Sequence, residues 1–379
     1  MNLLYMAPVY IDEEKPDGVA KKVLNQYTVF EKKYAAWLVY YGKNGVIVRH
    51  GSIKSVINYG SFHRRFLLYS EVKKLVDLTE FDAIYIRYPK SDPNFISVIK
   101  KMKESGAKIV IEIPTFPYNG ESLRSIKTAL IALVDGIYRM QLKRYIDRIV
   151  TYSDDNLIFG IKTIKTINGI VFDNVIQREY VPGKAYVNMI AVATVWSCHG
   201  FDRIIAGIEE YYKNGGSEEI HFNIVGNGPY IDNYRRQLSK CLYANKRVEL
   251  CGFQTGKKLD ELYNEANIAV NSLALHRIGL KKESTLKTKE YAAKGLPMIS
   301  SCEVDAFDNT GNALYVMRVD DAETPIKMED VITFIKNVYN DKSVAEVSRQ
   351  IRETSRKVCD MEVTLQGVMN FFGYEAKKD

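Results

Sequence analysis

The sequence predicts an α/β protein made of two Rossmann-like domains that face each other across a cleft. Short apolar segments alternate with segments of helical period along the chain, which is typical of parallel sheets with right-handed crossovers. The length of 379 residues exceeds what one hydrophobic core usually supports. The turn dipeptide Asn168-Gly169 and the aperiodic stretch after it divide the alternation into two series.

The first series is predicted to form five strands with helices between them. The helix at Val19–Phe30 is indicated by Val19, Val23, Tyr27 and Phe30, whose spacing places them on one face. The predicted strands are Leu3–Ala7, Val46–Arg49, Ala83–Arg87, Ile109–Ile113 and Arg148–Tyr152.

The second series is expected to end its last helix before a strand, because Gly295 and Pro297 follow that helix. The predicted strands are Met189–Thr194, His221–Val225, Val248–Cys251, Ile268–Asn271 and Met298–Ser301, and the predicted helices are Asp202–Tyr212, Tyr230–Leu242, Lys257–Ala266 and Leu286–Lys294. We therefore expect an N-terminal domain over 1–170, a linker over 171–187 and a C-terminal domain over 188–355, with segment 356–379 packing back on the first domain.

The charge distribution, the cysteines and the lengths of the apolar runs limit the classes of protein to which this chain can belong. Lys plus Arg minus Asp plus Glu gives 26 − 17 = +9 for residues 1–170 and 27 − 29 = −2 for residues 171–379. The five cysteines contain no CxxC pair, which favours reduced thiols in the cytoplasm and argues against a metal centre. The chain has no run of 18 apolar residues and its N-terminus lacks a charged leader, so we expect neither secretion nor a membrane span.

The most informative segment runs from Arg277 to Ser300. It reads as a loop with Ser284 and Thr285 that enters a helix carrying Lys287 and Glu290 on one face. Backbone N–H groups at the start of such a helix, with a nearby cation, can hold a diphosphate, and a carboxylate one turn on can accept from ribose hydroxyls. The alternative is an ordinary helix ion pair.

Other loops follow predicted strand ends, where open α/β sheets bind ligands. Gly18, Gly226-Asn227 and Gly252 could let a phosphate or sugar approach the backbone, or could simply form turns. His199 could donate to a ligand phosphate or be a solvated loop residue, and Arg277 could clamp an anion with its planar fork or be a surface residue.

Several of these segments resemble one family. The segments, in chain order, are Ile167-Asn168-Gly169-Ile170, His199-Gly200-Phe201-Asp202-Arg203, Ile224-Val225-Gly226-Asn227-Gly228-Pro229, Val248–Phe253, Arg277-Ile278-Gly279 and Ser284–Pro297. Together they resemble the nucleotide-sugar signature of GT-B glycosyltransferases, in particular the retaining enzymes of family 4. The resemblance covers nearly the whole chain and is strongest from 190 to 300.

The resemblance implies a retaining transferase that moves a sugar from a nucleotide diphosphate donor, a UDP-sugar foremost, with no metal or other cofactor. By that likeness Glu290 binds the ribose with Leu286 beside it, and Lys287 with Arg277 balances the diphosphate charge. Gly18 lets the first domain approach the donor, and Gly252 with Phe253 borders the base.

Two departures from the family pattern affect the predicted catalytic residues. Position 282 is Lys where the family commonly has Glu, and the carboxylate Glu283 is displaced by one. The usual Arg and Lys near the first strand of the second domain are Thr194 and His199. The predicted catalytic group is therefore Arg277, Lys287, Glu290, Glu283 and His199.

The acceptor side is expected in the first domain, at the end of the strand Ile109–Ile113. Glu112, Thr115 and Tyr118 are the candidates there, with Glu112 as a base or an acceptor ligand. A strand-end carboxylate bonded to the backbone is an equal alternative for Glu112. The acceptor implied by the resemblance is a saccharide or a lipid-linked saccharide.

A membrane surface is a further candidate partner. Leu123–Val150 interleaves apolar residues with Arg and Lys, and Phe62–Leu67 is also basic and apolar. Such surfaces can lie on anionic lipid, although a core-facing helix with a solvated basic side fits equally well. No segment resembles an RNA-binding module, so nucleic acid is not expected.

We therefore predict a cytoplasmic glycosyltransferase of bacterial polysaccharide or glycoconjugate synthesis, peripheral on the inner face of the cell membrane. Two alternatives stay open. A nucleotide-sugar 2-epimerase of the same fold would release free nucleotide without an acceptor, and a transferase-like binding subunit would hold a nucleotide sugar without turnover.

Overall fold

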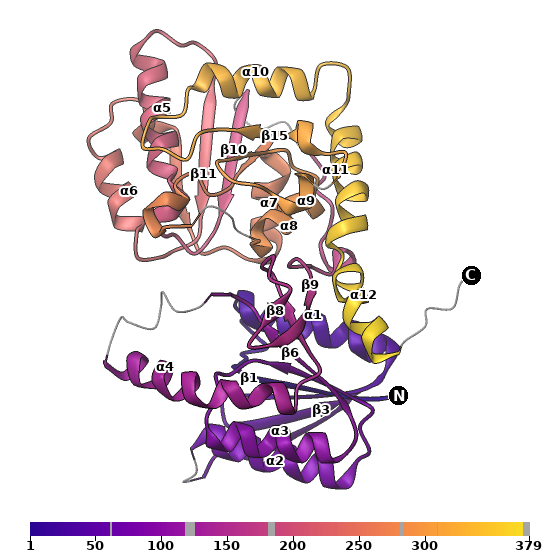
Figure 1. The fold of residues 1–379 in the computed structure, drawn as a ribbon. Helices are drawn as coiled ribbons and strands as arrows, with labels where there is room; N and C mark the ends of the chain where they lie inside the picture. Colours follow the sequence, from indigo (N-terminus) through magenta and orange to yellow (C-terminus); the bar gives the residue numbers. More distant parts are fainter. Residues whose placement is uncertain (61–62, 118–125, 181–185, 281–283, 309, 374–379) are drawn as a thin grey trace. The chain divides into compact units, whose positions relative to one another are not determined.

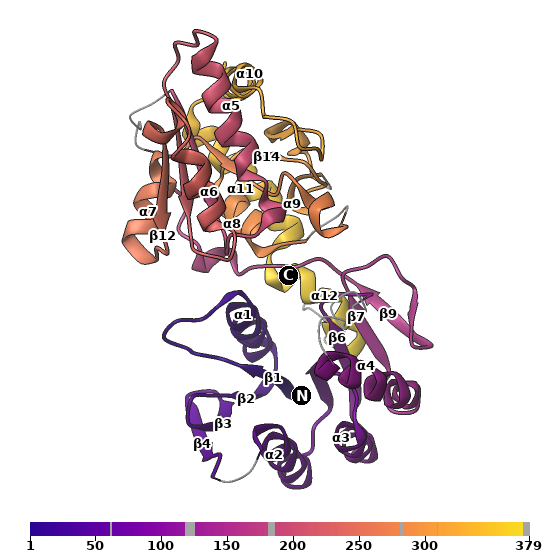
Figure 2. The same cartoon turned by 90° about the vertical axis from the view of Figure 1, so that its left-hand side faces the viewer.

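The computed structural model describes residues 1–60, 63–117, 126–180, 186–280, 284–308 and 310–373. It divides into two compact units (Figures 1 and 2). The N-terminal unit contains Met1–Gly169 and Met361–Asp379, and the C-terminal unit contains Ile170–Asp360. The predicted fold class is confirmed in both units, since each is built on a largely or wholly parallel sheet flanked by helices.

The N-terminal unit is built on a nine-stranded sheet with the order β4-β3-β2-β1-β5-β6-β7-β9-β8. Its strands are β1 Asn2–Tyr10, β2 Ala35–Tyr41, β3 Gly45–His50, β4 Ile53–Asn58, β5 Ala83–Arg87, β6 Lys108–Ile113, β7 Arg148–Thr151, β8 Leu157–Ile158 and β9 Ile161–Lys165. Its helices are α1 Gly18–Lys33, α2 Arg64–Leu78, α3 Pro93–Glu104, α4 Ile126–Tyr138 and α12 Met361–Phe372, with the 3₁₀ turn η2 Arg139–Arg144. In Figure 2, α1 lies on one face of this sheet and α2 and α3 lie on the other.

All five strands predicted for the first series are present, and four more were not predicted. β2, β3 and β4 form an antiparallel meander at one edge of the sheet. β4 was missed because it is an exposed edge strand, so its residues do not alternate between apolar and polar in the way that a half-buried strand requires. Within the described ranges, the short β8 pairs with β9 alone.

The C-terminal unit has a six-stranded, wholly parallel sheet with the order β12-β11-β10-β13-β14-β15. Its strands are β10 Val187–Val192, β11 Ile220–Val225, β12 Val248–Gly252, β13 Ile268–Val270, β14 Met298–Ser300 and β15 Val316–Arg318. Its helices are α5 Phe201–Lys213, α6 Ile231–Leu238, α7 Gly256–Glu265, α8 Leu286–Lys294, α9 Asp305–Asp308, α10 Met328–Val338 and α11 Val344–Cys359. Short 3₁₀ turns are η3 Phe172–Asn174, η4 Ser197–His199, η5 Ala244–Lys246, η6 Leu275–Ile278 and η7 Ala313–Tyr315.

Two segments near the ends of the units have clear partners. Within the N-terminal unit, α12 is held by the ion pair of Lys33 with Glu362 at 2.6 Å and by the hydroxyl of Thr166, which donates to the Thr364 carbonyl at 2.7 Å. The stretch for which we expected a linker belongs to the C-terminal unit as far as it is described. There Arg178 is buried and donates to Ser348 Oγ at 3.1 Å.

No helix in the described ranges is both long enough and apolar enough to span a bilayer.

Candidate active site

The candidate site of the C-terminal unit lies on loops that follow the carboxyl ends of β10 and β13 and on the start of α8. Tyr291, which is fully buried, fixes α8 to the sheet because its hydroxyl accepts from the backbone N–H of Val192 at 2.8 Å. This anchor places the first turn of α8 next to the strand ends, where parallel sheets bind ligands.

Lys287 is the cation of this site. Its Nζ donates to the hydroxyl of Ser272 at 2.8 Å, and Ser272 is buried just after β13. Two further polar atoms lie buried in the residues that begin α8 and end β13. Among the described residues, neither Thr285 Oγ1 nor Asn271 Oδ1 has a hydrogen-bond partner. Buried polar atoms without a partner are rare in folded proteins, so these two are good candidates for contact with a bound polar group.

His199 is neutral at physiological pH. Its side chain is buried and stacks on Phe201, with ring centroids 5.3 Å apart. Burial, and after it the nearby positive charge of Lys287, lower the pKa of His199 to about 2. The backbone N–H of Trp196 donates to His199 Nδ1 at 3.0 Å, which places the ring proton on Nε2. His199 is therefore a neutral Nε2–H donor in the neighbourhood of Lys287.

Glu290 lies one turn after Lys287 on α8 and is partly buried. Burial is the main cause that raises the pKa of Tyr263, and the negative charge of Glu290 is the second. The Glu290 carboxylate therefore lies near the buried Tyr263 phenol. The spacing of Lys287 and Glu290 on one face, which the sequence predicted, is present in the structure because α8 is regular from Leu286 to Lys294.

The start of α8 is held by a buried ion pair that the sequence did not indicate. Lys289 is fully buried and pairs with Asp305 at the start of α9. The Ser284 hydroxyl bridges the two, since Lys289 Nζ donates to it at 3.1 Å and it donates to Asp305. Ser284, Thr285 and Leu286 therefore sit on an internally braced turn.

The guanidinium of Arg277 forms ion pairs with two carboxylates. It donates bidentately to Asp202, at 2.8 and 2.7 Å, and also to Glu323. It donates in addition to the Ser197 carbonyl at 3.0 Å, and these bonds to the two carboxylates raise its pKa. The structure thus corrects the expectation of an arginine available to clamp a phosphate, because two negative charges already neutralise it.

Close packing requires glycine at position 226, independently of the role that the sequence predicted for it. A Cβ on Gly226 would lie 2.0 Å from the Ala193 carbonyl oxygen, and one on Gly228 would lie 2.3 Å from that of Val195. These glycines let the loop after β11 pass against the loop after β10, and the Val195 N–H donates to the Asn227 carbonyl at 3.0 Å.

Gly252 ends β12 with a φ of +64°, and a Cβ there would lie 4.0 Å from Asn227 Oδ1. The next side chain, Phe253, is exposed and not packed in the core. Asn227 and Gly252 therefore lie close together at the strand-end edge, with Phe253 next to them, and the contact of Gly252 and Phe253 with a base stays a prediction.

The N-terminal unit places Glu112 in a buried network, not on a surface. Lys22 Nζ lies 2.6 Å from the Glu112 carboxylate, which also accepts from Tyr152 at 2.8 Å and from Tyr85 and Gln26 at 3.0 Å. These charges and hydrogen bonds outweigh desolvation and lower the pKa of Glu112 to about 2. The proposed role of Glu112 as a base or acceptor ligand is corrected, since a fully buried, saturated carboxylate can neither touch an acceptor nor take its proton.

The remaining predicted residues have simpler positions. Gly18 begins α1, a Cβ there would meet nothing within 4 Å, and Asp17 caps the helix by accepting from the Ala20 N–H at 2.8 Å. Thr115 is exposed on the loop after β6. Tyr118 and Glu283 lie outside the described residues.

The structure therefore gathers Lys287, Glu290, Ser284, Thr285 and Leu286 on one braced helix start, with His199 nearby. Sequence reasoning missed four residues of this site: Asn271, Ser272, Lys289 and Asp305. Asn271 and Ser272 could have been found, because they end the predicted strand Ile268–Asn271 and follow it. The pair of Lys289 and Asp305 leaves no such signal.

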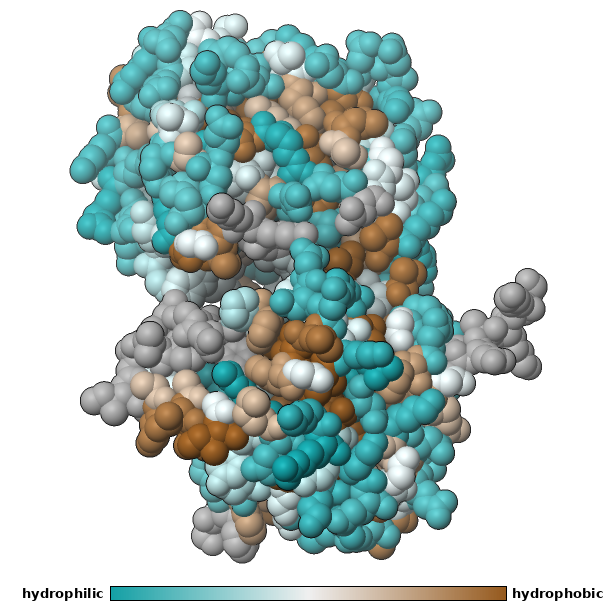
Figure 3. All heavy atoms as spheres, in the orientation of Figure 1, coloured by the Kyte–Doolittle hydropathy of each residue, from teal (hydrophilic) through white to brown (hydrophobic). Residues whose placement is uncertain are grey.

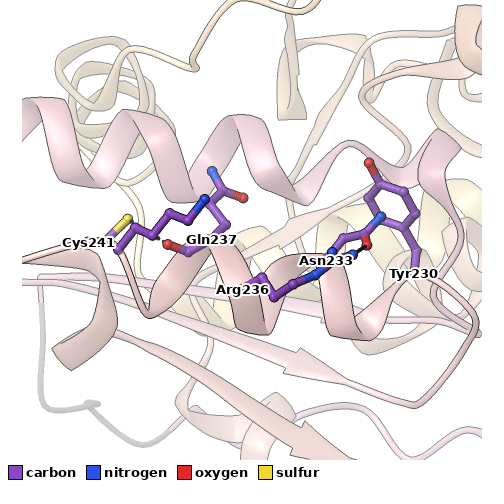
Figure 4. A pocket seen from close by; sticks show the side chains of 6 residues that line it. Tyr230, Asn233, Arg236, Gln237 and Cys241 are labelled. Carbon is purple, nitrogen blue, oxygen red and sulfur yellow. Dashed lines mark hydrogen bonds between the residues drawn. The ribbon is translucent and has the colours of Figure 1, made fainter.

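A surface pocket lies elsewhere, along one side of α6 (Figure 4). None of the predicted site residues lines it; its lining is Tyr230, Asn233, Arg236, Gln237, Lys240 and Cys241. Among the described side chains, no three His, Cys, Asp or Glu residues gather closely enough to hold a metal ion.

Comparison with known proteins finds one family model that matches most of this unit. Residues 187–356 match the family model described as glycosyl transferases group 1, which covers the strand ends and all of α8. Over these residues the C-terminal unit is similar to group 1 glycosyltransferases. No curated protein matches the sequence.

Solved structures extend the likeness to the whole chain. Trehalose-6-phosphate synthase OtsA aligns with a TM-score of 0.59 at 13% identity, covering 99% of this chain and 100% of that one. WaaG, a glycosyltransferase involved in lipopolysaccharide biosynthesis, aligns with a TM-score of 0.58 at 12% identity, covering 98% and 100%. This chain thus has the two-domain fold with parallel sheets that GT-B glycosyltransferases share, as the sequence predicted.

The pneumococcal O-GlcNAc transferase GtfA, solved in complex with UDP and GlcNAc, aligns with a TM-score of 0.51 at 12% identity. The alignment covers 88% of this chain but 66% of that chain, so this chain spans slightly less than two thirds of GtfA.

Proposed function

We propose that this protein is a retaining, metal-independent glycosyltransferase of family 4 that transfers a sugar from a UDP-sugar to a saccharide or lipid-linked acceptor. Its biological setting would be bacterial polysaccharide or glycoconjugate synthesis in the cytoplasm, at the inner face of the cell membrane. The observation that supports the proposal most directly is the group 1 glycosyltransferase match, because Lys287, Glu290 and His199 all lie within it. The UDP bound to GtfA supports the choice of base.

In this proposal the diphosphate lies at the first turn of α8. Lys287 supplies the positive charge, and the backbone N–H groups of the turn, together with Thr285 Oγ1, supply hydrogen-bonding groups. As the sugar–phosphate bond breaks, negative charge grows on the leaving diphosphate, and a cation held in place by Ser272 stabilises it. Glu290, one turn further, accepts from the ribose hydroxyls.

His199 and Arg277 then have different tasks. The Nε2–H of the neutral His199 donates to the sugar or to a phosphate oxygen, without adding charge. Arg277 ties the turn η6 to the turn η4 through Ser197 and to the start of α5 through Asp202, and so holds the loop that carries His199. Arg277 is thus a positioning residue, and Lys287 is the phosphate cation.

The test is a thermal-shift series with UDP, GDP, ADP, CMP and dTDP and with their sugar conjugates. A ligand that binds only the folded protein stabilises it by about 2.7 kcal/mol at a hundredfold excess over Kd. We expect a shift with UDP that is lost in Lys287→Ala and in Glu290→Ala. The exposed residues Lys257 and Glu261 of α7 provide matched controls, and Lys257→Ala and Glu261→Ala should keep the shift. No shift with any nucleotide would refute donor binding.

Turnover separates the transferase from its two alternatives. Product that forms only with an acceptor, with the anomeric configuration of the donor retained and in the presence of EDTA, is expected. Free UDP released from a UDP-sugar together with an epimerised sugar would instead identify the epimerase. Tight UDP binding without product from any saccharide or lipid-linked acceptor would identify the binding subunit.

A further inference from the structure

The helix α4 carries an unusual apolar face. Leu130, Leu133, Ile137 and Met140, in α4 and the first turn after it, are 61%, 63%, 60% and 56% exposed. Their spacing of three, four and three residues places them in one stripe along the helix. Figure 3 shows the brown, hydrophobic side chains gathered over α4. We call these four residues the α4 stripe.

The opposite side of α4 is firmly attached to its unit. Asp135 is buried and accepts from the Tyr88 hydroxyl at 2.5 Å and from the Ser91 N–H at 2.6 Å. Tyr138 packs against the core of the N-terminal unit, and Leu142, just beyond the helix, lies within that core. Because these contacts fix the rotation of α4 about its axis, the α4 stripe faces outward in the folded unit.

The exposed charged residues of the segment between Thr128 and Ile146 are positive. Between Thr128 and Ile146 the only acidic residue is Asp135, which is buried on the other side. The cations of this stretch are Arg139, Lys143 and Arg144, and the last two are exposed where the helical segment ends. The chain from 1 to 170 carries an excess of nine positive charges, from 26 − 17. An apolar stripe beside exposed cations complements an anionic lipid surface, in which acyl chains lie beneath negative headgroups.

We propose that the α4 stripe inserts at the interface of an anionic membrane, with Lys143 and Arg144 on the lipid headgroups. This assigns a contact surface to the peripheral location included in the proposed function, and it requires neither nucleotide binding nor catalysis. A protein partner with an apolar groove would not explain why the exposed charges of this segment, Lys143 and Arg144, are both positive. Lipid explains both features, and an interfacial helix of this kind buries its apolar face about 5–10 Å deep.

The test is co-sedimentation of the full chain with vesicles of phosphatidylglycerol and phosphatidylcholine, compared with vesicles of phosphatidylcholine alone. We expect binding to the anionic vesicles at low salt. Leu133→Ser/Ile137→Ser should lower the bound fraction about tenfold, because it removes apolar area from the stripe. Leu78→Ser provides the matched control, since Leu78 is 83% exposed in the same unit but at the end of α2.

A second pair of variants tests the charges. Lys143→Glu/Arg144→Glu should lower binding about tenfold at low salt, where charges are screened least. Lys32→Glu/Lys43→Glu makes the same change in net charge at two exposed lysines elsewhere in the unit and should have a much smaller effect.

Three results would overturn the proposal. They are failure of the wild-type chain to pellet with anionic vesicles, binding by Leu133→Ser/Ile137→Ser equal to that of Leu78→Ser, and a dimer in gel filtration that this double variant dissociates without any lipid binding. The last result would show that the stripe is a contact between copies of the chain. The UDP thermal shift, measured on the same variants, separates the two proposals: vesicle binding without a UDP shift would remove the donor site alone.

Discussion

Glu112 in the N-terminal unit and Lys287 in the C-terminal unit are both charged residues near strand ends, but their surroundings differ in burial and in hydrogen bonding. Glu112 is fully buried, and Lys22, Tyr152, Tyr85 and Gln26 all bond to its carboxylate. Lys287 is only partly buried and lies in a part of the unit where buried polar atoms of neighbouring residues lack partners. The first arrangement is complete within the protein, whereas the second has polar groups left for a ligand.

Saturation of its hydrogen-bonding groups, and not charge or position, separates a structural ion cluster from a binding site. A carboxylate whose lone pairs are all used contributes to folding and cannot act on a substrate. A cation that lies near buried polar atoms without hydrogen-bond partners has groups beside it with which a ligand can form hydrogen bonds. Arg277 falls on the saturated side with Glu112, although the sequence grouped it with Lys287.

The largest expected effect is on stability, at Glu112. Glu112→Ala leaves Lys22 buried without its carboxylate, which typically costs about 3–5 kcal/mol. We expect a loss of that size in the free energy of unfolding of the N-terminal unit, measured by urea denaturation. Glu104→Ala removes an exposed carboxylate of α3 and should change it by less than about 0.5 kcal/mol. A stable Glu112→Ala protein that had lost transfer activity would restore the role of base.

The next largest effect is on UDP binding, at Lys287. Loss of a hydrogen bond from a charged donor typically costs about 1.5–3 kcal/mol, so Lys287→Ala should weaken UDP binding about tenfold to a hundredfold. Titration calorimetry measures it, with Lys257→Ala as the control. Unchanged UDP affinity in Lys287→Ala would remove the distinction on which the comparison depends.

A smaller effect, mainly on stability, is expected at Arg277. Arg277→Ala removes the bonds to Asp202 and Glu323, but Glu323 is largely exposed and can be hydrated, so we expect a loss of about 1–2 kcal/mol. UDP affinity should fall less than in Lys287→Ala, since the guanidinium acts through the loops that it ties. A greater loss of affinity than in Lys287→Ala would mean that Arg277 leaves its carboxylates and binds phosphate.

The smallest effect concerns pH, at His199. Because burial lowers the pKa of His199 in the folded state to about 2, against 6.5 for the free side chain, the unfolded state takes up the proton first. Its contribution to stability is therefore present above pH 6.5 and is lost as the pH falls, by about 1 kcal/mol at pH 6. His199→Gln should remove this part of the pH dependence. An NMR titration of His199 with a midpoint near 6.5 would contradict a buried neutral imidazole.

His276 contributes to the pH dependence of stability with the opposite sign to His199, so the same measurement contains both contributions. Its pKa is raised by hydrogen bonds to Asp321 and Glu323, so its contribution is present below pH 6.5 and is lost as the pH rises through its folded-state value. The comparison of wild type with His199→Gln cancels this contribution, because His276 is present in both.

Much of the fold and part of the site could be predicted from the sequence. The alternation of apolar and helical periods indicated the parallel sheets, and the segment from Ser284 to Pro297 placed Lys287 and Glu290 on one helix face, since local spacing decides both. The edge strand β4 was missed because almost all of its residues are exposed. The ion pair of Lys289 with Asp305 was missed because the two residues are far apart in sequence and meet only in the folded protein.

The sequence by itself thus determined the class of fold, the position of α8 and the types of residue at the strand ends, because these depend on neighbours within a few turns of the chain. Only the tertiary structure decided which predicted site residues are saturated by partners within the protein. Arg277 meets Asp202 across 75 positions of sequence, and Glu112 meets Gln26 across 86. The tertiary structure also decided that the α4 stripe faces outward. Both sides of α4 carry apolar residues, and the hydrogen bonds that Asp135 accepts from Tyr88 and Ser91 turn the side with Asp135 toward the unit.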